Sequence, residues 1–349
     1  MDLKNVIFAI ALSFAVLFGW SVIFDTPQIE EQKKAEQTKN YQKKDSKTSD
    51  APSVNLENNK TPNISRKDAI ASGKRIKFEN KNVKGSIALK GALIDDIIFK
   101  KYKAKLNSTE RITYLNPAET NDGYFIETGW ASSNIDKISL PTTKTIWKVK
   151  GNNKLSENNP VIIEWNNNSG LTFRKKIELD DKFLFRITQE IQNKSSKRVE
   201  LYPYAQITRN QKPILGAGSM SGTMILHDGF IGVFDEDLKE YDYDDIEDKK
   251  KEHNAESGWL GITDKYWITA LVPEKNQPFK GEFVYKGGFK ANYILNKPVV
   301  VQPSSSKTSR TKVFVAAKEV KVIDGYAESE VINKFDLTID WGWLYFLTK

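Results

Sequence analysis

The chain has 349 residues, of which 39% are hydrophobic and 11% aromatic, and 53 Lys and Arg against 45 Asp and Glu give it a net charge of +8. The positive excess is scattered and forms no basic stripe, which argues against a nucleic-acid partner. The absence of cysteine excludes disulfides, thiol catalysis and thiolate metal sites. Because all-β domains of about 200 to 250 residues are common, the chain has room for one large domain beside shorter segments.

Residues 6–24, VIFAIALSFAVLFGWSVIF, form an uncharged apolar run. A bilayer core about 30 Å thick needs roughly 20 apolar residues in a helix, so residues 1–24 are predicted to form a transmembrane anchor. A cleavable secretory signal is the alternative, but only Lys4 makes the start basic, and the exit after Trp20 is too bulky for signal peptidase. A buried helix of a soluble protein would show a polar stripe, and this run has none.

The lysines around this run leave its orientation open. One lysine precedes the run, whereas five follow it within about 20 residues. Taken alone, this bias points the N-terminus outward, but long domains are exported largely regardless of charge. The charge count therefore decides neither orientation.

Residues 25–74 are rich in Lys, Gln, Glu, Asn, Ser and Thr, with Tyr41 as the only aromatic residue between Phe24 and Phe78. Such a segment cannot bury enough apolar area to offset the entropy lost on ordering it. We therefore predict a disordered polar tether. Contact of this segment with anionic headgroups is the alternative, but the interspersed acidic residues weaken it.

From Arg75 onward, short runs of alternating or β-branched residues are broken about every 8 to 12 positions by Gly, Asn, Asp or Pro, which is typical of an all-β domain. Turn signals such as NNNSG at residues 166–170 separate apparent antiparallel neighbours, and there is no βαβ alternation. The sequence thus predicts a large antiparallel β-sandwich over residues 75–328, with a helical period only at residues 319–323 and at the C-terminal end. The expected strands are residues 76–78, 85–89, 93–102, 145–149, 161–165, 171–179, 183–192, 198–207, 266–272, 281–285 and 313–317.

Residues 329–349 are predicted to form a short interfacial helix after the sandwich. Their last part, FDLTIDWGWLYFLTK, is apolar and aromatic, and such side chains suit the boundary between headgroups and hydrocarbon. The nine residues after Asp340 span about 13 Å as a helix, which is too short to cross a bilayer. Either the segment is interfacial or a longer membrane segment begins here. The predicted membrane-interface residues are Trp341, Trp343, Tyr345 and Phe346.

No constellation for metal or catalytic chemistry stands out. His227 and His253 lack the spacing of a helical metal pair. The acidic run in residues 235–251 lacks the central Gly and spaced Glu of a calcium loop, and we interpret it as a solvated loop. Residues 216–219, GAGS, resemble a phosphate-binding turn, but no Walker Lys-Ser/Thr pair follows. Neither G-x-S-x-G nor H-E-x-x-H occurs, so no metal, cofactor or catalytic residue is predicted.

Two runs, GWLGITDKYW at residues 258–267 and FDLTIDWGWLYFLTK at residues 335–349, closely resemble the YidC family of bacterial membrane protein insertases, relatives of the mitochondrial Oxa and chloroplast Alb proteins. The resemblance covers essentially the whole chain, in order, and looks most like the Gram-negative, alphaproteobacterial branch. Further matches are GSIALKGA at residues 85–92, GLTFRK at 170–175, LYPY at 201–204 and AAKEV at 316–320.

The resemblance implies an anchor that starts in the cytoplasm, a periplasmic twisted β-sandwich akin to sugar mutarotases (a supersandwich), and an interfacial helix. It places the protein in the bacterial inner membrane and implies a non-enzymatic function: insertion, folding and assembly of integral membrane proteins, alone or with the Sec translocon. The implied partners are inner membrane lipid, Sec translocon components and nascent membrane proteins. In the family, insertion is carried out by five later membrane helices, which the resemblance places after residue 349.

A sugar-binding or aldose-epimerase-like enzyme on the same membrane-tethered sandwich is the alternative function. It would need a general acid and base, such as a His and a Glu, in a concave face, and the only two histidines lie near predicted loops. A generic membrane-tethered scaffold is a third possibility, which the C-terminal resemblance disfavours.

The run at residues 258–267 has a structural interpretation. We expect a turn at Gly258 and Gly261, followed by a strand that packs Trp267 in the core. These residues suit a corner of the sandwich better than a binding site.

Overall fold

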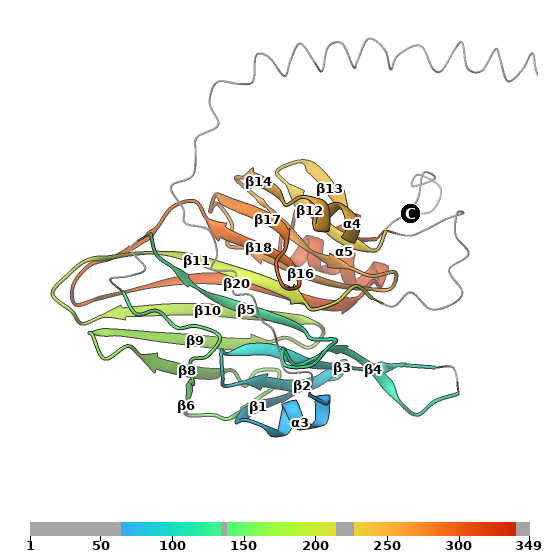
Figure 1. Ribbon diagram of the computed structural model, residues 1–349, viewed down its shortest axis with the longest axis horizontal. Helices are drawn as coiled ribbons and strands as arrows, with labels where there is room; N and C mark the ends of the chain where they lie inside the picture. The colour runs from blue at the N-terminus through green and yellow to red at the C-terminus, as the bar shows by residue number, and fades with distance from the viewer. Residues whose placement is uncertain (1–63, 106, 134–137, 214–226, 340–349) are drawn as a thin grey trace, which may run out of the picture. The chain divides into compact units, whose positions relative to one another are not determined.

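The computed structural model describes residues 64–105, 107–133, 138–213 and 227–339. Within these ranges the chain is mainly β, and its strands form two large sheets with a shared hydrophobic core (Figure 1). The predicted large antiparallel β-sandwich is confirmed. The predicted membrane-spanning helix at residues 6–24 lies outside the described residues. None of the helices that are described has the length and apolar character needed to cross a membrane.

The first sheet draws its strands from both ends of the described chain. The strands are β1 (Arg75–Glu79), β2 (Val83–Ala88), β3 (Leu93–Lys103), β4 (Arg111–Leu115), β5 (Tyr124–Ala131), β7 (Lys154–Leu155), β11 (Val199–Arg209), β14 (Lys251–Ala255), β17 (Phe279–Tyr285), β18 (Phe289–Leu295) and β19 (Val299–Val301). The main path of the sheet is β14-β17-β18-β11-β5-β3-β2-β1-β7, with β4 beside β3 and β19 beside β11. Neighbouring strands of this sheet are antiparallel, except that β1 and β7 pair in parallel.

The second sheet is antiparallel along its described path, and the helices are short. Its strands are β6 (Lys148–Lys150), β8 (Val161–Asn166), β9 (Leu171–Leu179), β10 (Leu184–Asn193), β12 (Gly229–Phe234), β13 (Asp237–Tyr241), β15 (Gly258–Thr263), β16 (Trp267–Pro273) and β20 (Ser305–Ala317). They pair in the order β13-β12-β15-β16-β20-β10-β9-β8-β6. The described helices are α3 (Arg66–Ala71), α4 (Tyr243–Asp248), α5 (Val320–Ser329) and the 3-10 helix η2 (Phe335–Thr338).

Sequence alternation explains how each sheet acquires an apolar inner face. Strand β9 reads LTFRKKIEL, and beyond its first residues buried positions alternate with partly exposed ones. Successive side chains of a strand point to opposite faces, so Phe173 and Ile177 face inward. Strand β10 repeats the pattern with Phe185 and Ile187. Each such side chain contributes about 1.5 to 3 kcal/mol when buried, which holds the two sheets together.

A row of polar residues interrupts this apolar inner face. Lys175 of β9, Gln189 of β10 and Ser309 of β20 are paired across the sheet, and all three are buried. The Nζ of Lys175 donates to the Thr128 carbonyl of the opposite sheet at 2.6 Å. That carbonyl is accessible because β5 pairs with β3 only at residue 126. The polar row therefore connects the two sheets by hydrogen bonds.

Burial dominates the electrostatics of Lys175. It lowers the pKa of Lys175 from the usual 10.5 to about 8, and the nearby Glu127 carboxylate opposes part of this effect. The Lys175 ammonium also lies 5.0 Å from the ring centroid of Trp147. A protonated lysine at this position therefore costs folding free energy, because its neighbours replace the lost hydration only in part.

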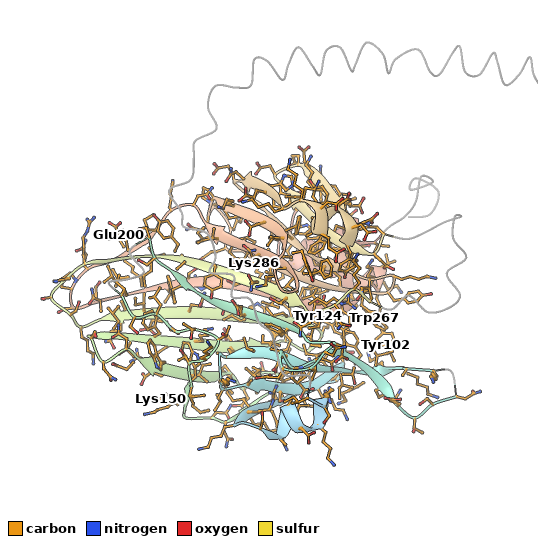
Figure 2. All side chains as sticks on the ribbon, viewed as in Figure 1. Tyr102, Tyr124, Lys150, Glu200, Trp267 and Lys286 are labelled. Carbon is orange, nitrogen blue, oxygen red and sulfur yellow. The ribbon has the colours of Figure 1, made fainter. Side chains whose placement is uncertain are left out.

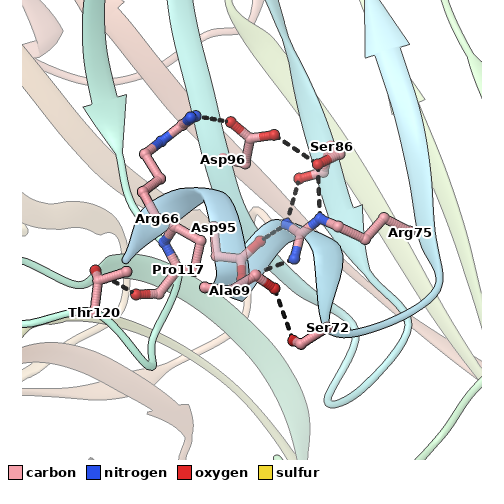
Figure 3. A network of polar contacts seen from close by, with 9 residues as sticks. All are labelled: Arg66, Ala69, Ser72, Arg75, Ser86, Asp95, Asp96, Pro117 and Thr120. Carbon is pink, nitrogen blue, oxygen red and sulfur yellow. Dashed lines mark hydrogen bonds and ion pairs between the residues drawn. The ribbon is translucent and has the colours of Figure 1, made fainter. Parts of the chain in front are cut away.

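Two ion pairs fasten α3 and β1 to the first sheet (Figure 3). Arg66 of α3 pairs with Asp96, and Arg75 of β1 pairs with Asp95. The Ser86 hydroxyl links the pairs, since it donates to Asp96 at 2.6 Å and accepts from Nε of Arg75 at 2.7 Å. Burial raises the pKa of Asp95 to about 6, although Arg75 acts in the opposite direction. The network is thus structural, because each carboxylate has its own arginine.

A β-bulge explains how two consecutive aspartates reach the same network. Strands β2 and β3 pair Ser86 with Asp96, whereas the next residue of β2 pairs with Ile94. Asp95 is therefore an extra residue on β3. A bulge turns its extra side chain away from the regular alternation, and Asp95 and Asp96 both contact Ser86 or its partner Arg75.

Regular structure is present within the N-terminal segment for which composition predicts a tether. Helix α3 lies within residues 25–74, the predicted tether, yet Ala69 is buried and the backbone N–H of Ile64 donates to Glu119. Ser65 caps the helix by accepting from the N–H of Asp68. Composition misses this helix because a few specific polar contacts, and not a large apolar area, attach it. Residues 25–63 lie outside the described residues.

The interpretation of residues 235–251 as a solvated loop is wrong. This stretch contains β13 and α4, and α4 buries Tyr243 and Ile246. The ring of Tyr243 packs edge-on to Phe289 at 4.8 Å. The high content of carboxylates led the sequence analysis to overlook two apolar residues, which share one face of a short helix. The predicted helical period at residues 319–323, in contrast, is confirmed as the start of α5.

The buried charge of Lys175 predicts a pH dependence of stability. Below about pH 8 the folded protein bears the full cost of the protonated amine; above 10.5 the amine is neutral in both states and the cost disappears. Between these values the unfolded chain binds more protons, so stability rises with pH. Relative to Lys175→Met, the wild-type free energy of unfolding is expected to rise by about 3 kcal/mol across this window, measured by urea denaturation.

Lys176→Met is the matched control, because Lys176 is a neighbour on the same strand whose side chain is 45% exposed and pairs with Glu178. Its difference from the wild type should stay flat with pH. A flat difference for Lys175→Met as well would contradict the buried charge.

Candidate functional site

One corner of the sandwich gathers aromatic and cationic side chains around a groove. It lies where the end of β3, the turn between β15 and β16, and the junction of β20 with α5 come together, and its volume is about 480 Å³. Figure 2 shows Tyr102 and Trp267 close to each other at this corner and Lys150 far from them. We call this set of residues the corner groove. Its lining residues are Tyr102, Lys103, Lys265, Tyr266, Trp267, Ala317, Lys318, Glu319 and Ile339.

Trp267 forms the inner wall of the corner groove. Its ring stacks on the buried Phe99 with centroids 4.9 Å apart, and Tyr102 meets it edge-on at the same distance. The predicted strand at Trp267 is present, and the ring packs against the core as expected, but it is only half-buried and lies at the edge of the core. Trp267 is the first residue of β16, so one face of its ring packs on the core and the rest borders the groove.

A buried ion pair fixes the turn that carries Tyr266. Asp264 directly follows β15, and its backbone N–H donates to the Trp267 carbonyl at 2.8 Å, which closes the turn. Arg209 donates to Oδ1 of Asp264 at 2.6 Å and to the Tyr243 hydroxyl at 3.1 Å. Both charged side chains are about 15% exposed. Because Arg209 holds the turn through Asp264 on its buried side, Tyr266 projects outward and is 58% exposed.

The surroundings of this ion pair keep it charged. Burial is the largest single effect and would lower the pKa of Arg209, but the Asp264 carboxylate and the nearby tyrosine hydroxyls together outweigh it and raise this pKa above its usual value. The Arg209 guanidinium also lies over the Tyr124 ring, 4.8 Å from its centroid. Burial raises the pKa of the Tyr124 hydroxyl to about 12. The pair therefore acts as a fixed structural support, and no group in it is poised for proton transfer near neutral pH.

A second hydrogen bond positions the junction between β20 and α5. The Tyr102 hydroxyl donates to the Glu319 carboxylate. Burial is the main cause that raises the pKa of Tyr102, and the contact with Glu319 raises it further. The backbone N–H of Lys318 donates to the Tyr266 carbonyl at 2.9 Å. The groove is thus closed by contacts between β3, the β15–β16 turn and the start of α5.

The C-terminal part of the described chain is attached to the sandwich by one aromatic cluster. Trp259 of β15 and Phe335 of η2 are fully buried and meet edge-on at 5.4 Å. Phe335 also meets Phe314 of β20 at 4.9 Å, and Nε1 of Trp259 donates to the Asn333 carbonyl at 3.1 Å. This cluster joins the two sequence runs at residues 258–267 and 335–349. It directs the chain so that Ile339 lines the corner groove.

Glycines allow the strands around Trp259 to approach closely. The expected turn at Gly258 and Gly261 is absent, because both residues belong to β15. A Cβ at Gly258 would lie 1.9 Å from the Val233 carbonyl oxygen, and one at Gly261 would lie 2.1 Å from that of Thr269. Gly258 also has φ of +142°, which other residues rarely adopt. The glycines therefore serve close strand packing, and the turn follows at Asp264.

The histidines have structural partners in separate places. Nε2 of His227 is 3.0 Å from the Phe230 carbonyl, and Nε2 of His253 is 2.9 Å from the Tyr241 hydroxyl. Burial lowers the pKa of His253. Among the described residues, no three His, Cys, Asp or Glu side chains are grouped as metal ligands. Residues 216–219, the candidate phosphate-binding turn, lie outside the described residues.

The predicted membrane-interface residues also lie outside the described part of the chain, but the corner groove lies next to them in sequence. Residue 340 follows Ile339 directly. Sequence reasoning missed the remaining members of the corner, because Lys103, Lys265 and Tyr102 come from distant segments. One available signal was the DKY triplet after β15, which combines a turn-forming aspartate with a lysine and a tyrosine. The interface residues Trp341, Trp343, Tyr345 and Phe346 remain a prediction.

The fold and the corner together define a class, a large antiparallel β-sandwich protein with an aromatic and cationic edge beside its C-terminal exit. Comparison with known families is more specific. The family model described as "YidC periplasmic domain" matches residues 75–349. The chain belongs to the YidC periplasmic domain family.

Curated relatives match over the length of the chain. "Membrane protein insertase YidC" of Pelagibacter ubique is 47% identical, and the alignment covers 100% of this chain and 61% of that protein. Proteins of the same name from Rickettsia bellii and Methylorubrum extorquens are 37% and 36% identical; both alignments cover 100% of this chain, with 61% and 60% of the relatives. The expected alphaproteobacterial resemblance is confirmed. The chain spans about three fifths of the length of these relatives.

Solved structures show more distant similarity. A galactose mutarotase-like protein from Lactobacillus casei has a TM-score of 0.49 and 10% sequence identity, covering 70% of this chain and 100% of that one. A putative aldose 1-epimerase from Escherichia coli has a TM-score of 0.44 and 7% identity, covering 70% of this chain and 99% of that one.

The buried pair of Arg209 and Asp264 is expected to determine the stability of the corner. Arg209→Met leaves the aspartate buried and unpaired, which should lower the free energy of unfolding by about 3 to 5 kcal/mol. The double variant Arg209→Met/Asp264→Leu should lose much less, because neither charge remains. Chemical denaturation of the purified protein measures both effects.

The control for this pair is Arg198→Met. Arg198 forms an ion pair with Glu200 but is 63% exposed, so its loss should cost less than about 1 kcal/mol. A similarly small loss for Arg209→Met would show that the buried pair does not support the turn.

Proposed function

We propose that this chain is the N-terminal and periplasmic part of a membrane protein insertase that assists insertion, folding and assembly of integral membrane proteins, alone or with the Sec translocon. The observation that carries the proposal is the match over 100% of the chain to proteins named "Membrane protein insertase YidC", at 47% identity in Pelagibacter ubique. Nascent membrane proteins are its proposed substrates, and Sec translocon components and inner membrane lipid its proposed partners. The protein is proposed to act without enzymatic chemistry.

The proposed arrangement follows the sequence. Residues 1–24 anchor the protein in the bacterial inner membrane with the N-terminus in the cytoplasm, and residues 25–74 are proposed as a tether, now shortened by α3. Residues 75–328 form the periplasmic sandwich, of the twisted mutarotase-like type. Residues 329–349 contain the interfacial helix. The corner groove supports this arrangement, because Ile339 lines an aromatic and cationic surface directly before the proposed interface residues.

A sugar-binding or epimerase-like enzyme is not favoured. Such chemistry needs an acid and a base aimed at one substrate position. His253 instead contacts Tyr241, and His227 contacts the Phe230 carbonyl. Mutarotation of galactose by the purified protein is expected to proceed at the rate in buffer alone. A protein-dependent acceleration would contradict the non-enzymatic assignment.

Insertion can be tested with the protein extended by the helices that the family resemblance places after residue 349. Vesicles that contain it are expected to integrate a newly synthesised single-span membrane protein, measured as a protease-protected fragment. Vesicles without it provide the baseline. Equal protection in both vesicle populations would contradict the insertase function.

The interface residues can be tested on the chain itself. Deleting residues 1–24 removes the proposed anchor, and the C-terminal segment is then expected to make this variant float with anionic vesicles. Trp341→Ser/Trp343→Ser should reduce flotation several-fold, because Trp side chains favour the headgroup level. Tyr285→Ser, at an exposed ring elsewhere on the sandwich, is the control and should have no effect. If the anchorless chain does not float, the interfacial helix must be abandoned.

A further inference from the structure

The corner groove combines amphipathic aromatic rings with lysine side chains. Tyr266 is 58% exposed and Trp267 is half-buried beside it, while Lys103 and Lys265 are exposed at the rim. No ion pair to an acidic side chain is observed for either lysine within the described ranges. The ammonium of Lys265 lies 5.1 Å from the centroid of the Tyr266 ring. Amphipathic rings beside lysines are the combination found where proteins meet the membrane–water boundary.

The charge of the groove favours an anionic occupant. Three lysines, at positions 103, 265 and 318, and one carboxylate, that of Glu319, line it. Lys318 also interacts electrostatically with the Asp228 carboxylate, so the positive excess comes from Lys103 and Lys265. Glu319 is engaged by the Tyr102 hydroxyl, and the nearby carboxylate of Asp264 is neutralised by Arg209. The field at the rim is therefore positive, and a phosphate-bearing group is attracted to it.

The size and position of the groove fit a lipid headgroup. The groove has a volume of about 480 Å³, and its lining includes the apolar side chains of Ala317 and Ile339 as well as polar ones. Ile339 immediately precedes residues 340–349, the proposed interfacial helix, which as a helix is about 15 Å long. A surface so close to that helix lies within reach of the headgroup layer, so lipid is present at high local concentration.

We propose that the corner groove binds the headgroup of an anionic phospholipid, with Lys103 and Lys265 at the phosphate and the rings of Tyr266 and Trp267 at the acyl boundary. This proposal rests on the proposed membrane location of residues 340–349. It adds a second contact, made by the sandwich itself. Two contacts with the membrane would fix the orientation of the sandwich, which a single point of attachment does not.

The absence of cysteine allows a direct test on the full chain, because one introduced thiol can be labelled selectively. A fluorophore at Ala104→Cys, an exposed position next to Lys103, reports on the groove, and one at Lys150→Cys reports on a distant exposed site (Figure 2). The labelled chain is reconstituted into vesicles of phosphatidylcholine, alone or with an equal part of phosphatidylglycerol. Both vesicle types carry a doxyl-labelled lipid that quenches nearby fluorophores.

Several-fold stronger quenching is expected at residue 104 than at residue 150, and only in the anionic vesicles. Lys103→Glu/Lys265→Glu should abolish the excess. Lys297→Glu/Lys307→Glu makes the same change in charge at exposed positions elsewhere and should leave it intact; Lys307 is ten residues before Ala317 on β20, about 33 Å along the strand. Millimolar inorganic phosphate should not displace the lipid, because the aromatic rings contact the lipid and make no contact with a free phosphate ion.

Each other result overturns the proposal. Equal quenching at the two labels would show that the corner does not contact lipid, and quenching that survives the lysine reversal would assign the groove to residues 340–349 or another apolar occupant. Loss of the excess in phosphate would assign the site to a free anion. Flotation of the full chain tests the proposed function separately. Flotation with anionic vesicles but not with neutral ones would contradict the anchor at residues 1–24, and flotation with neither vesicle type would contradict both the anchor and the lipid-binding groove.

Discussion

Burial of the two inner sheet faces against each other is the constraint on which the rest of this structure depends. Polar groups enclosed between the two faces lose contact with water and are costly unless they find hydrogen-bond partners. In the row of Lys175, Gln189 and Ser309, the Lys175 ammonium and the Gln189 amide donate to carbonyls of the opposite sheet, whereas Oε1 of Gln189 has no hydrogen-bond partner among the described residues. The same requirement applies at the edges, where the charged side chains of Arg209 and Asp264 are buried together.

The corner groove follows from this constraint. The Arg209–Asp264 pair fixes the turn that exposes Tyr266, and the aromatic cluster of Trp259 and Phe335 brings the chain back to the same place at Ile339. One buried ion pair and one buried aromatic cluster thus determine the shape of this corner. If the corner binds lipid as proposed, the sandwich has a fixed orientation relative to the membrane.

The sequence predicted regular features better than those that arise from distant contacts. Period-two alternation identified strands such as β9 and β10, because a half-buried strand must repeat every second residue. It missed β5, where seven of eight residues are buried and no alternation remains, and it missed α4, whose two apolar residues sit among carboxylates. Trp267 was placed in the core because a tryptophan in a strand is usually buried, but its position at the strand end leaves it at an edge.

What the sequence determined by itself was the class of fold and the family, since alternation, turn signals and two long motifs are local properties of the chain. Tertiary structure alone decided the site. Lys103, Lys265 and Lys318 are separated by 50 residues or more along the chain, and no local pattern relates them. Lys265 and Lys318 meet because β16 pairs with β20, and Lys103 joins them because β3 of the other sheet packs against Trp267. A buried arginine from β11 holds the turn between β15 and β16 in place.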